Sequence, residues 1–253
     1  MQWWMQPAQE GGPLPRWVVL GYSAVLALTA GFVNAVAILL LAFPVANVTA
    51  ATTQLGMNTA NPWLYEGHLL GAIIFGFLVG AAIAGAVLAP TQAQAGMRHA
   101  ALLFCEATLL GLAAAGLEDT PVRTLLSTLG LEQPILQAVC AATALGMQNG
   151  LTSSFRGMAV RTTHFTGTIT DLGLMIGRSR QHGLEKWKVT VLSVTFVLFL
   201  TGGVIGLLVG SRLGGWSLVI PMVTCLAVAA GCVVHSRSRG AERDDAVAES
   251  VPA

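Results

Sequence analysis

Long apolar stretches without charge alternate with short polar segments along the chain. Five stretches contain no Asp, Glu, Lys, Arg or His: residues 17–65, 69–97, 133–155, 189–211 and 213–234. A sixth, residues 99–117, carries a single carboxylate, Glu106. A helix needs about 20 apolar residues to cross the hydrocarbon core of a bilayer, and each stretch reaches about that length. The pattern predicts six transmembrane helices, over residues 17–43, 67–89, 99–117, 133–155, 187–211 and 213–235.

The composition favours a membrane protein and gives no sign of an enzyme. Of the 253 residues, 54% are apolar and 10% are charged, whereas soluble domains carry about 25% charged residues. The sequence contains no phosphate-binding loop, nucleophile elbow or zinc-protease motif. Four cysteines in the apolar stretches lack metal-ligand spacing and are interpreted as buried apolar side chains: Cys105, Cys140, Cys225 and Cys232. We therefore expect no enzyme activity, no metal and no cofactor.

The basic residues predict how the chain is oriented. With the N-terminus inside, eleven Lys and Arg residues lie in inside segments, and two, Arg123 and Arg212, lie outside. Cytoplasmic loops of membrane proteins carry this excess of positive charge, so we expect an inner-membrane (plasma-membrane) protein with both termini in the cytoplasm. Because topology explains the basic loops, nucleic-acid binding is not expected. The remaining segments are a cytoplasmic N-terminal segment, an acidic extracytoplasmic linker and a disordered cytoplasmic tail, over residues 1–16, 118–132 and 236–253.

Two halves of the chain share a pattern of polar residues. AGFVNA in the first half is followed by NVTAATTQLG, and LGMQNG in the second is followed by HFTGTITDLG. Aligning Asn34 with Asn149 places Thr49 close to Thr166, and FLVGAAI later in the first half matches FLTGGVI in the second. Each half has three predicted spans, an odd number, so the second half must enter the membrane in the opposite sense. The predicted fold class is an all-α membrane protein of two inverted three-helix repeats, residues 17–117 and 133–235, as in many transporters.

The connections after the first and fourth spans have an unusual composition for loops. Residues 44–62 contain no charge and many Thr, Asn and Gln residues, and residues 160–177 are their counterpart. We interpret both as short helices that re-enter the membrane from opposite faces, where irregular backbone is tolerated only inside protein or around a wet cavity. Thr49 and Thr163 or Thr166 can cap these helices, whose free N–H groups favour anions. The alternative is a pair of interfacial helices that lie on the membrane.

A few polar side chains near these segments are candidates for solute or ion binding. Glu106 lies inside a predicted span, where a charge costs roughly 2.5–3.5 kcal/mol, so it must pair, be protonated or serve a function. His164 and Asp171 are seven residues apart, about two helical turns, and could relay protons. Three amides need a partner or a wet path: Asn34, Gln148 and Asn149. Interhelical hydrogen bonding explains the amides and Glu106 equally well, and an exposed loop is the alternative for His164 and Asp171.

The second-half motifs resemble those of a known family. ALGMQNG at residues 144–150, followed by VRTTHFTGTITDLG, resembles the YoaK-type family of bacterial membrane proteins, a family of unknown function, over roughly residues 17–235. The first half departs from the family pattern, because Asn34 takes the position of an Asp and residues 47–51 replace a His-Met-Thr-Gly-Asn run. The resemblance implies a multi-pass inner-membrane protein and no particular substrate.

These features favour a small secondary transporter or permease for an unknown small solute. The candidate substrate- or ion-binding residues are Asn34, Thr49, Glu106, Gln148, Asn149, His164, Thr166 and Asp171. A channel-like pore and a non-transporting membrane scaffold or assembly protein are the alternatives. The expected partners are the lipid bilayer and the solute, and the chain could also form a homo-oligomer.

Overall fold

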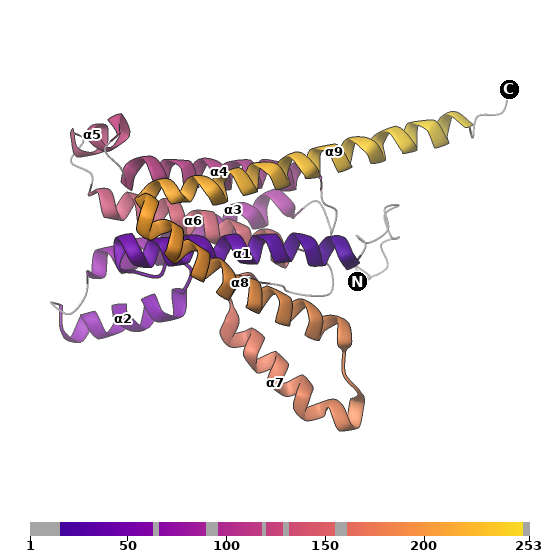
Figure 1. The fold of residues 1–253 in the computed structure, drawn as a ribbon, viewed down its shortest axis with the longest axis horizontal. Coiled ribbons are helices and arrows are strands. Elements are labelled where there is room, and N and C mark those ends of the chain that lie inside the picture. The colour runs from indigo at the N-terminus through magenta and orange to yellow at the C-terminus, as the bar shows by residue number, and fades with distance from the viewer. Residues whose placement is uncertain are drawn as a thin grey trace, which may run out of the picture.

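Helices make up all the regular secondary structure in the residues that the structure describes, which are 16–62, 66–89, 96–117, 120–128, 132–154 and 161–249. In this computed structural model the longest helices run roughly side by side (Figure 1): α1 (Arg16–Leu41), α3 (Gly67–Leu88), α4 (Met97–Leu117), α6 (Gln133–Ser153), α8 (Lys186–Leu213) and α9 (Val219–Glu249). Each of them overlaps one of the six predicted spans. The predicted all-α fold is confirmed.

Two shorter helices follow α1 and α6, in the segments predicted to contain them. α2 (Val48–Ala60) begins after Asn47, whose side-chain oxygen accepts a hydrogen bond of 3.0 Å from the backbone N–H of Ala50. Its counterpart α7 (Phe165–His182) ends at Gly183, whose φ of 73° lies in the left-handed region that glycine adopts without steric cost. Figure 1 shows α2 and α7 leaving the middle of the bundle in opposite directions.

Several helical stretches in the described part of the chain are long and apolar enough to cross a membrane. There are four: Arg16–Leu41, Gly67–Leu88, Met97–Gly116 and Lys186–Ser238. The last contains α8, the 3₁₀ helix η1 (Gly214–Leu218) and α9 as far as Ser238, and α9 folds back along the bundle after η1. α6 is less apolar because it carries several amide side chains, and most of its residues are buried between other helices. These stretches indicate a membrane protein.

The bundle is built from helix pairs. α1 packs along α8, α3 packs along α6, and α4 packs against both α6 and α9. The core holds fully buried leucines and isoleucines such as Leu70, Ile73, Leu103, Leu110 and Leu145. Between helices that lie in lipid, close van der Waals packing rather than burial from water holds such surfaces together. Shape complementarity at these contacts therefore determines the fold.

Glycines bring the helix pairs together at matched positions. A Cβ atom at Gly31 of α1 would overlap the backbone carbonyl oxygen of Phe199 in α8. A Cβ atom at Gly146 of α6 would overlap the carbonyl oxygen of Phe77 in α3 in the same way. A second matched set is Gly202 against Leu28 and Gly80 against Thr143. Small residues of this kind let helix backbones touch, and alanine would hold them apart.

Two segments differ from the sequence prediction. The linker over residues 118–132 contains a short helix, α5 (Pro121–Thr128), which begins with a proline, a residue suited to the first helical turn. α9 continues to Glu249, so residues 236–249 of the expected disordered tail are helical. The run SRSRGAERDDAVAE is rich in Ala, Arg and Glu, which extend a helix that is already nucleated. Residues 1–15 and 250–253 lie outside the described residues.

Candidate functional site

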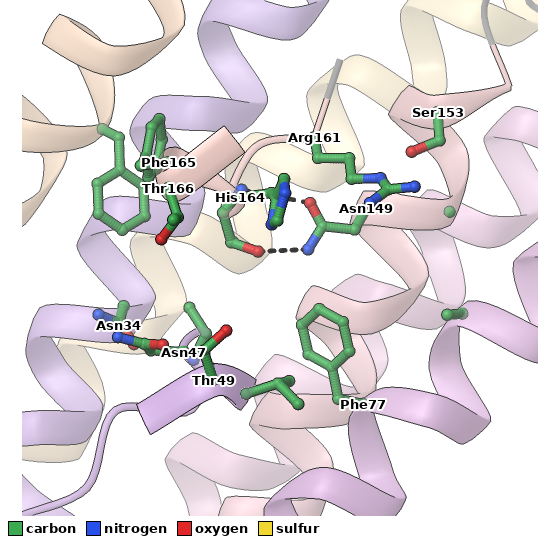
Figure 2. Close-up of a pocket in the computed structure, with 16 residues that line it drawn as sticks. Asn34, Asn47, Thr49, Phe77, Asn149, Ser153, Arg161, His164, Phe165 and Thr166 are labelled. Atoms are coloured by element: carbon green, nitrogen blue, oxygen red, sulfur yellow. Dashed lines mark hydrogen bonds between the residues drawn. The ribbon is translucent and has the colours of Figure 1, made fainter. Parts of the chain in front are cut away.

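A cavity of about 480 Å³ lies where the first turns of α2 and α7 approach each other. Long helices from both halves of the chain complete its wall. The first half contributes Asn34, Asn47, Thr49 and Phe77, and the second contributes Asn149, Ser153, Arg161, His164, Thr166 and Phe199. Figure 2 shows these two sets of side chains facing each other across open space. The cavity is therefore formed at the junction of the two halves.

Asn34 and Asn149 hold the two connections in the same way. The Oδ1 atom of Asn34 accepts a hydrogen bond of 2.9 Å from the backbone N–H of Ala46, two residues before α2. The Oδ1 atom of Asn149 accepts one of 3.3 Å from the backbone N–H of Thr163, two residues before α7. Because the partner in each case is a donor, the amide oxygen must face the backbone. Each asparagine thereby positions the start of a short helix.

The amide of Asn149 makes more contacts than that of Asn34. Its Oδ1 also accepts a hydrogen bond of 3.1 Å from the Thr162 hydroxyl, and its Nδ2 donates to the hydroxyl of Thr163. For Asn34, the structure shows no hydrogen bond from Nδ2 to any described residue. The NH₂ group of Asn34 is therefore available to a solute in the cavity.

The wall of the cavity carries positive charge. Among the wall residues that the structure describes, Arg161 and His164 have basic side chains, and none is acidic. Arg161 is exposed, and its guanidinium makes no ion pair or hydrogen bond with the residues described here. His164 immediately precedes α7 without capping it through its side chain, so the first turn of α7 adds the partial positive charge of its free N–H groups.

Phenyl rings supply the apolar part of the wall. Phe165 of α7 packs on Phe199 of α8, with ring centroids 4.5 Å apart, and on Phe196, with centroids 5.5 Å apart. Phe77 of α3 lines the cavity from another side (Figure 2). The cavity thus combines hydrogen-bond donors with apolar surfaces, a combination typical of sites for small organic molecules.

The structure brings together five of the eight candidate residues named from the sequence. They are Asn34, Thr49, Asn149, His164 and Thr166. Gln148 is fully buried beside them and does not reach the cavity. Its Nε2 donates hydrogen bonds to the carbonyl oxygen of Leu26 at 2.7 Å and to the hydroxyl of Thr162 at 2.9 Å. Gln148 therefore matches the interhelical hydrogen-bonding alternative, because it links α6 to α1.

Asp171 lies outside the cavity wall. Its carboxylate forms an ion pair with the amino group of Lys188 at the start of α8, at 3.4 Å, and both side chains are partly exposed. His164 lines the cavity and Asp171 does not, so the structure does not join them in one site. The spacing of seven residues places Asp171 about two turns along α7 from His164, the cap residue, without giving the two a common environment.

Glu106 also lies away from the cavity, within α4. Its side chain is fully buried, and neither carboxyl oxygen has a hydrogen-bond partner among the described residues. Polar groups close to it include the thiol of Cys225 on α9 and the phenol of Tyr22 on α1. A buried carboxyl group in such surroundings needs a proton or a partner, as expected from the sequence.

The sequence interpretation missed the aromatic part of the wall. Phe77 and Phe199 were not selected, although each is the first residue of the repeated FLxGxxI motif. The motif indicates a duplication, and the sequence alone assigns no role to its phenylalanines. Ser153 and Asn47 carry no such repeat and could not be separated from other polar residues at helix ends.

The comparisons with known proteins identify the family. The described residues contain no cluster of three His, Cys, Asp or Glu side chains able to bind a metal ion. A family model described as a protein of unknown function (DUF1275) matches residues 22–231, a range that includes the whole cavity wall. This match agrees with the resemblance to the YoaK-type family found in the second-half motifs. No curated protein and no solved structure gives a significant match.

Proposed function

This chain belongs to the DUF1275 family, and from that premise we propose that it is a small secondary transporter or permease that binds its solute in the cavity between α2 and α7. The observation that carries the proposal is the composition of the wall, which includes two pairs of equivalent residues from the two halves: Asn34 and Asn149, and Thr49 and Thr166. In transporters built from inverted repeats, the substrate site lies between the repeats, next to short or broken helices.

The proposed architecture is six spans in two inverted repeats, with α1, α3 and α4 in the first and α6, α8 and α9 in the second. The matched contacts of Gly31 with Phe199 and of Gly146 with Phe77 support it, because a duplicated unit paired with its inverted copy produces each contact twice. In Figure 1, α1 runs away from the end of the bundle where the N-terminus lies, and α6 runs towards that end.

In this proposal α2 and α7 are the re-entrant helices. Their first turns border the same cavity, and the helices then run to opposite ends of the bundle (Figure 1). Two interfacial helices that lie on opposite surfaces of the membrane are not expected to have their N-termini beside the same cavity. Alternating access then requires each short helix to separate from the other half in turn, which exposes the cavity to one side at a time.

We assign proton coupling to Glu106. A neutral carboxyl that is enclosed by α1, α4 and α9 can lose its proton only when those helices separate enough to admit water or a partner. Such a group responds to the same helix movements that open the cavity. This gives a physical link between proton binding and the state of the transporter without direct contact between Glu106 and the solute.

The orientation follows from the basic residues. Arg16, Arg98 and Lys186 stand at or near the starts of α1, α4 and α8, at the end of the bundle where α9 and the chain finish. The excess of positive charge expected on the cytoplasmic side supports a cytoplasmic position for this end, and with it for both termini. The membrane is then the inner (plasma) membrane.

Uptake by proteoliposomes that contain the purified full-length chain tests the transport function. A panel of labelled small solutes, offered with and without a proton gradient, should include one with saturable, gradient-dependent uptake. Thr166→Val removes a hydroxyl from the cavity and should slow that uptake about tenfold, the effect of losing roughly 1.4 kcal/mol of binding. Thr170→Val, one turn further along α7 and outside the cavity wall, is the matched control.

Other outcomes of this experiment would assign other functions. Uptake that does not saturate and does not depend on the proton gradient would identify a channel-like pore. A folded, reconstituted protein that moves none of the solutes would contradict transport and favour a membrane scaffold or assembly protein.

A further inference from the structure

We propose that the cavity between α2 and α7 selects a small organic anion, with its carboxylate beside Arg161 and its carbon skeleton against the phenyl rings. This inference rests on the proposed function of the cavity as the solute site and adds the chemical class of the solute. It is carried by the hydrogen-bonding groups, the charge and the shape of the wall taken together.

The first support is a surplus of hydrogen-bond donors. The side-chain oxygens of Asn34 and Asn149 are occupied by the backbone N–H groups of Ala46 and Thr163. These oxygens would otherwise be the acceptors that attract a cation or a hydroxyl donor. Among the described wall residues, the structure leaves unused three groups that can only donate: the NH₂ groups of Asn34 and Asn47 and the guanidinium of Arg161. The side chains of Thr49, Ser153, His164 and Thr166 are also unused and can donate or accept. A solute that satisfies the three groups that only donate must supply acceptor oxygens, as a carboxylate does.

The second support is uncompensated charge. Arg161 has no acidic partner among the described residues, and the residues that precede it, 155–160, contain no Asp or Glu in their sequence, FRGMAV. Asp171, an acid on the neighbouring helix α7, is already paired with Lys188. A guanidinium in the wall of a cleft raises the local concentration of anions and repels cations. The free N–H groups in the first turn of α7 act in the same direction.

The third support is the shape of the wall, which favours an organic anion over a small inorganic one. Phe77, Phe165 and Phe199 give the cavity apolar surfaces that cannot solvate a bare ion. A volume of about 480 Å³ lies in the range found for small-molecule sites, roughly 300–1,000 Å³. A monocarboxylate with a short aliphatic or aromatic body satisfies both parts of the wall, whereas chloride or sulfate would use only the donors.

Thiol labelling measures the charge preference without knowledge of the natural solute. Ser153 lines the cavity near Arg161 (Figure 2), so Ser153→Cys places a thiol at the site. Cys105, the exposed native cysteine, is replaced by alanine, and the buried Cys140, Cys225 and Cys232 are kept. The full-length variant in detergent reacts with an anionic reagent, 2-sulfonatoethyl methanethiosulfonate, or a cationic one, 2-(trimethylammonium)ethyl methanethiosulfonate. Thr53→Cys, on the exposed side of α2, gives the reference ratio of the two rates.

We expect the anionic-to-cationic rate ratio at Ser153→Cys to exceed the reference about fivefold, a typical effect of one nearby unit charge. Adding Arg161→Gln should return the ratio to the reference value, and adding Arg178→Gln, an exposed arginine on α7 outside the cavity, should not. A ratio equal to the reference, or one unaffected by Arg161→Gln, would overturn the assignment of an anion.

Protection of the same thiol tests the organic part of the solute. Butyrate and benzoate should slow the labelling of Ser153→Cys, whereas butyramide and benzamide, which have the same shape without the charge, should not at equal concentration. Protection by the amides, absence of protection by either carboxylate, or equal protection by chloride and sulfate would overturn the inference. Arg161→Lys should retain part of the protection, because lysine keeps the charge and loses the paired donors.

The two proposals fail in different ways. If carboxylates protect the thiol but never cross a proteoliposome membrane, this result would contradict transport and still support the anion site. Saturable uptake of an uncharged solute that is sensitive to Thr166→Val would support transport and overturn the anion assignment.

Discussion

Asn149 of α6 accepts the backbone N–H of Thr163 at 3.3 Å, one residue before the cap of α7. The first half repeats this contact between Asn34 and Ala46, one residue before the cap of α2. A side chain on a long helix thus fixes the position and direction of each short helix. Since these short helices border the cavity, the two asparagines are positioning residues for the site as well as part of its wall.

Replacing these asparagines should destabilise the protein unequally. Asn149→Ala removes the acceptor for the Thr163 N–H and the Thr162 hydroxyl and the donor to the Thr163 hydroxyl, whereas Asn34→Ala removes one acceptor. With about 1–3 kcal/mol for each buried group left unsatisfied, we expect losses of roughly 3 and 1 kcal/mol in the free energy of unfolding. Unfolding in mixed detergent micelles measures both, and equal losses would contradict the assigned network.

Asn34→Asp is the control for this comparison. A carboxylate oxygen can accept the Ala46 N–H as the amide oxygen does, so the free energy of unfolding should change by less than about 1 kcal/mol. Asn149→Asp should lower the free energy of unfolding more than Asn34→Asp does, because it removes the donor to the Thr163 hydroxyl.

Alanine at the matched glycines should disrupt the helix pairs. In Gly31→Ala and Gly146→Ala the new Cβ meets a backbone carbonyl oxygen, which cannot rotate away, so each variant should lose at least about 1–3 kcal/mol of stability. Gly71→Ala and Gly85→Ala in α3 are controls, because no atom lies within 4 Å of a Cβ at either position. They should be neutral or stabilising by up to about 1 kcal/mol, since alanine favours helix. The melting temperature in detergent measures all four.

The outcome for these glycines tests whether the repeated sequence reflects a repeated helix interface. If Gly31→Ala and Gly146→Ala are both damaging, the repeated sequence reflects a repeated interface. Tolerance of either substitution, with a melting temperature like that of Gly71→Ala, would show that the close approach at that position is not required.

The positions of most helices along the chain could be predicted from the sequence, whereas the way the helices pack against each other could not. Lipid imposes a strong rule, because a span must be apolar for about 20 residues, so α1 and α3 could be bounded almost to the residue. The central helix α6 was found through its freedom from charge, although its buried amides make it less apolar. No such rule applied after His235, where the end of α9 depends on helix propensity.

The site was predicted where residue type and repetition agreed. Asn34, Asn149, Thr49 and Thr166 are polar, repeated and close to a short helix, and all of them line the cavity. Glu106 was selected only because it is an acid inside a span. An acid in a span can face any neighbouring helix, so the sequence could not show that Glu106 lies away from the cavity. Side-chain partners, such as Lys188 for Asp171, depend on how helices cross and are set by three-dimensional packing.

Cysteine accessibility should place the outer ends of α2 and α7 on opposite sides of the membrane. Thr59, near the end of α2, and Gln181, near the end of α7, are both exposed, so each can carry a single reactive cysteine in the Cys105→Ala background. A membrane-impermeant maleimide should label Thr59→Cys in intact cells and Gln181→Cys only in inverted vesicles. Labelling of both from the same side would contradict the inverted arrangement, and with it the six-span topology.

Removing the acid of Glu106 should change coupling and leave the fold intact. Neither carboxyl oxygen has a hydrogen-bond partner among the residues described, so Glu106→Gln, which has nearly the same shape, should alter the free energy of unfolding by no more than about 1 kcal/mol. Glutamine cannot exchange a proton, so uptake in proteoliposomes should lose its dependence on the imposed proton gradient while downhill exchange of the solute continues. Glu185→Gln, an exposed acid at the start of α8, is the matched control and should keep the gradient dependence. If Glu106→Gln instead retained full coupling, the buried acid would serve only as a neutral contact between α4 and α9, and the proton would have to be carried elsewhere.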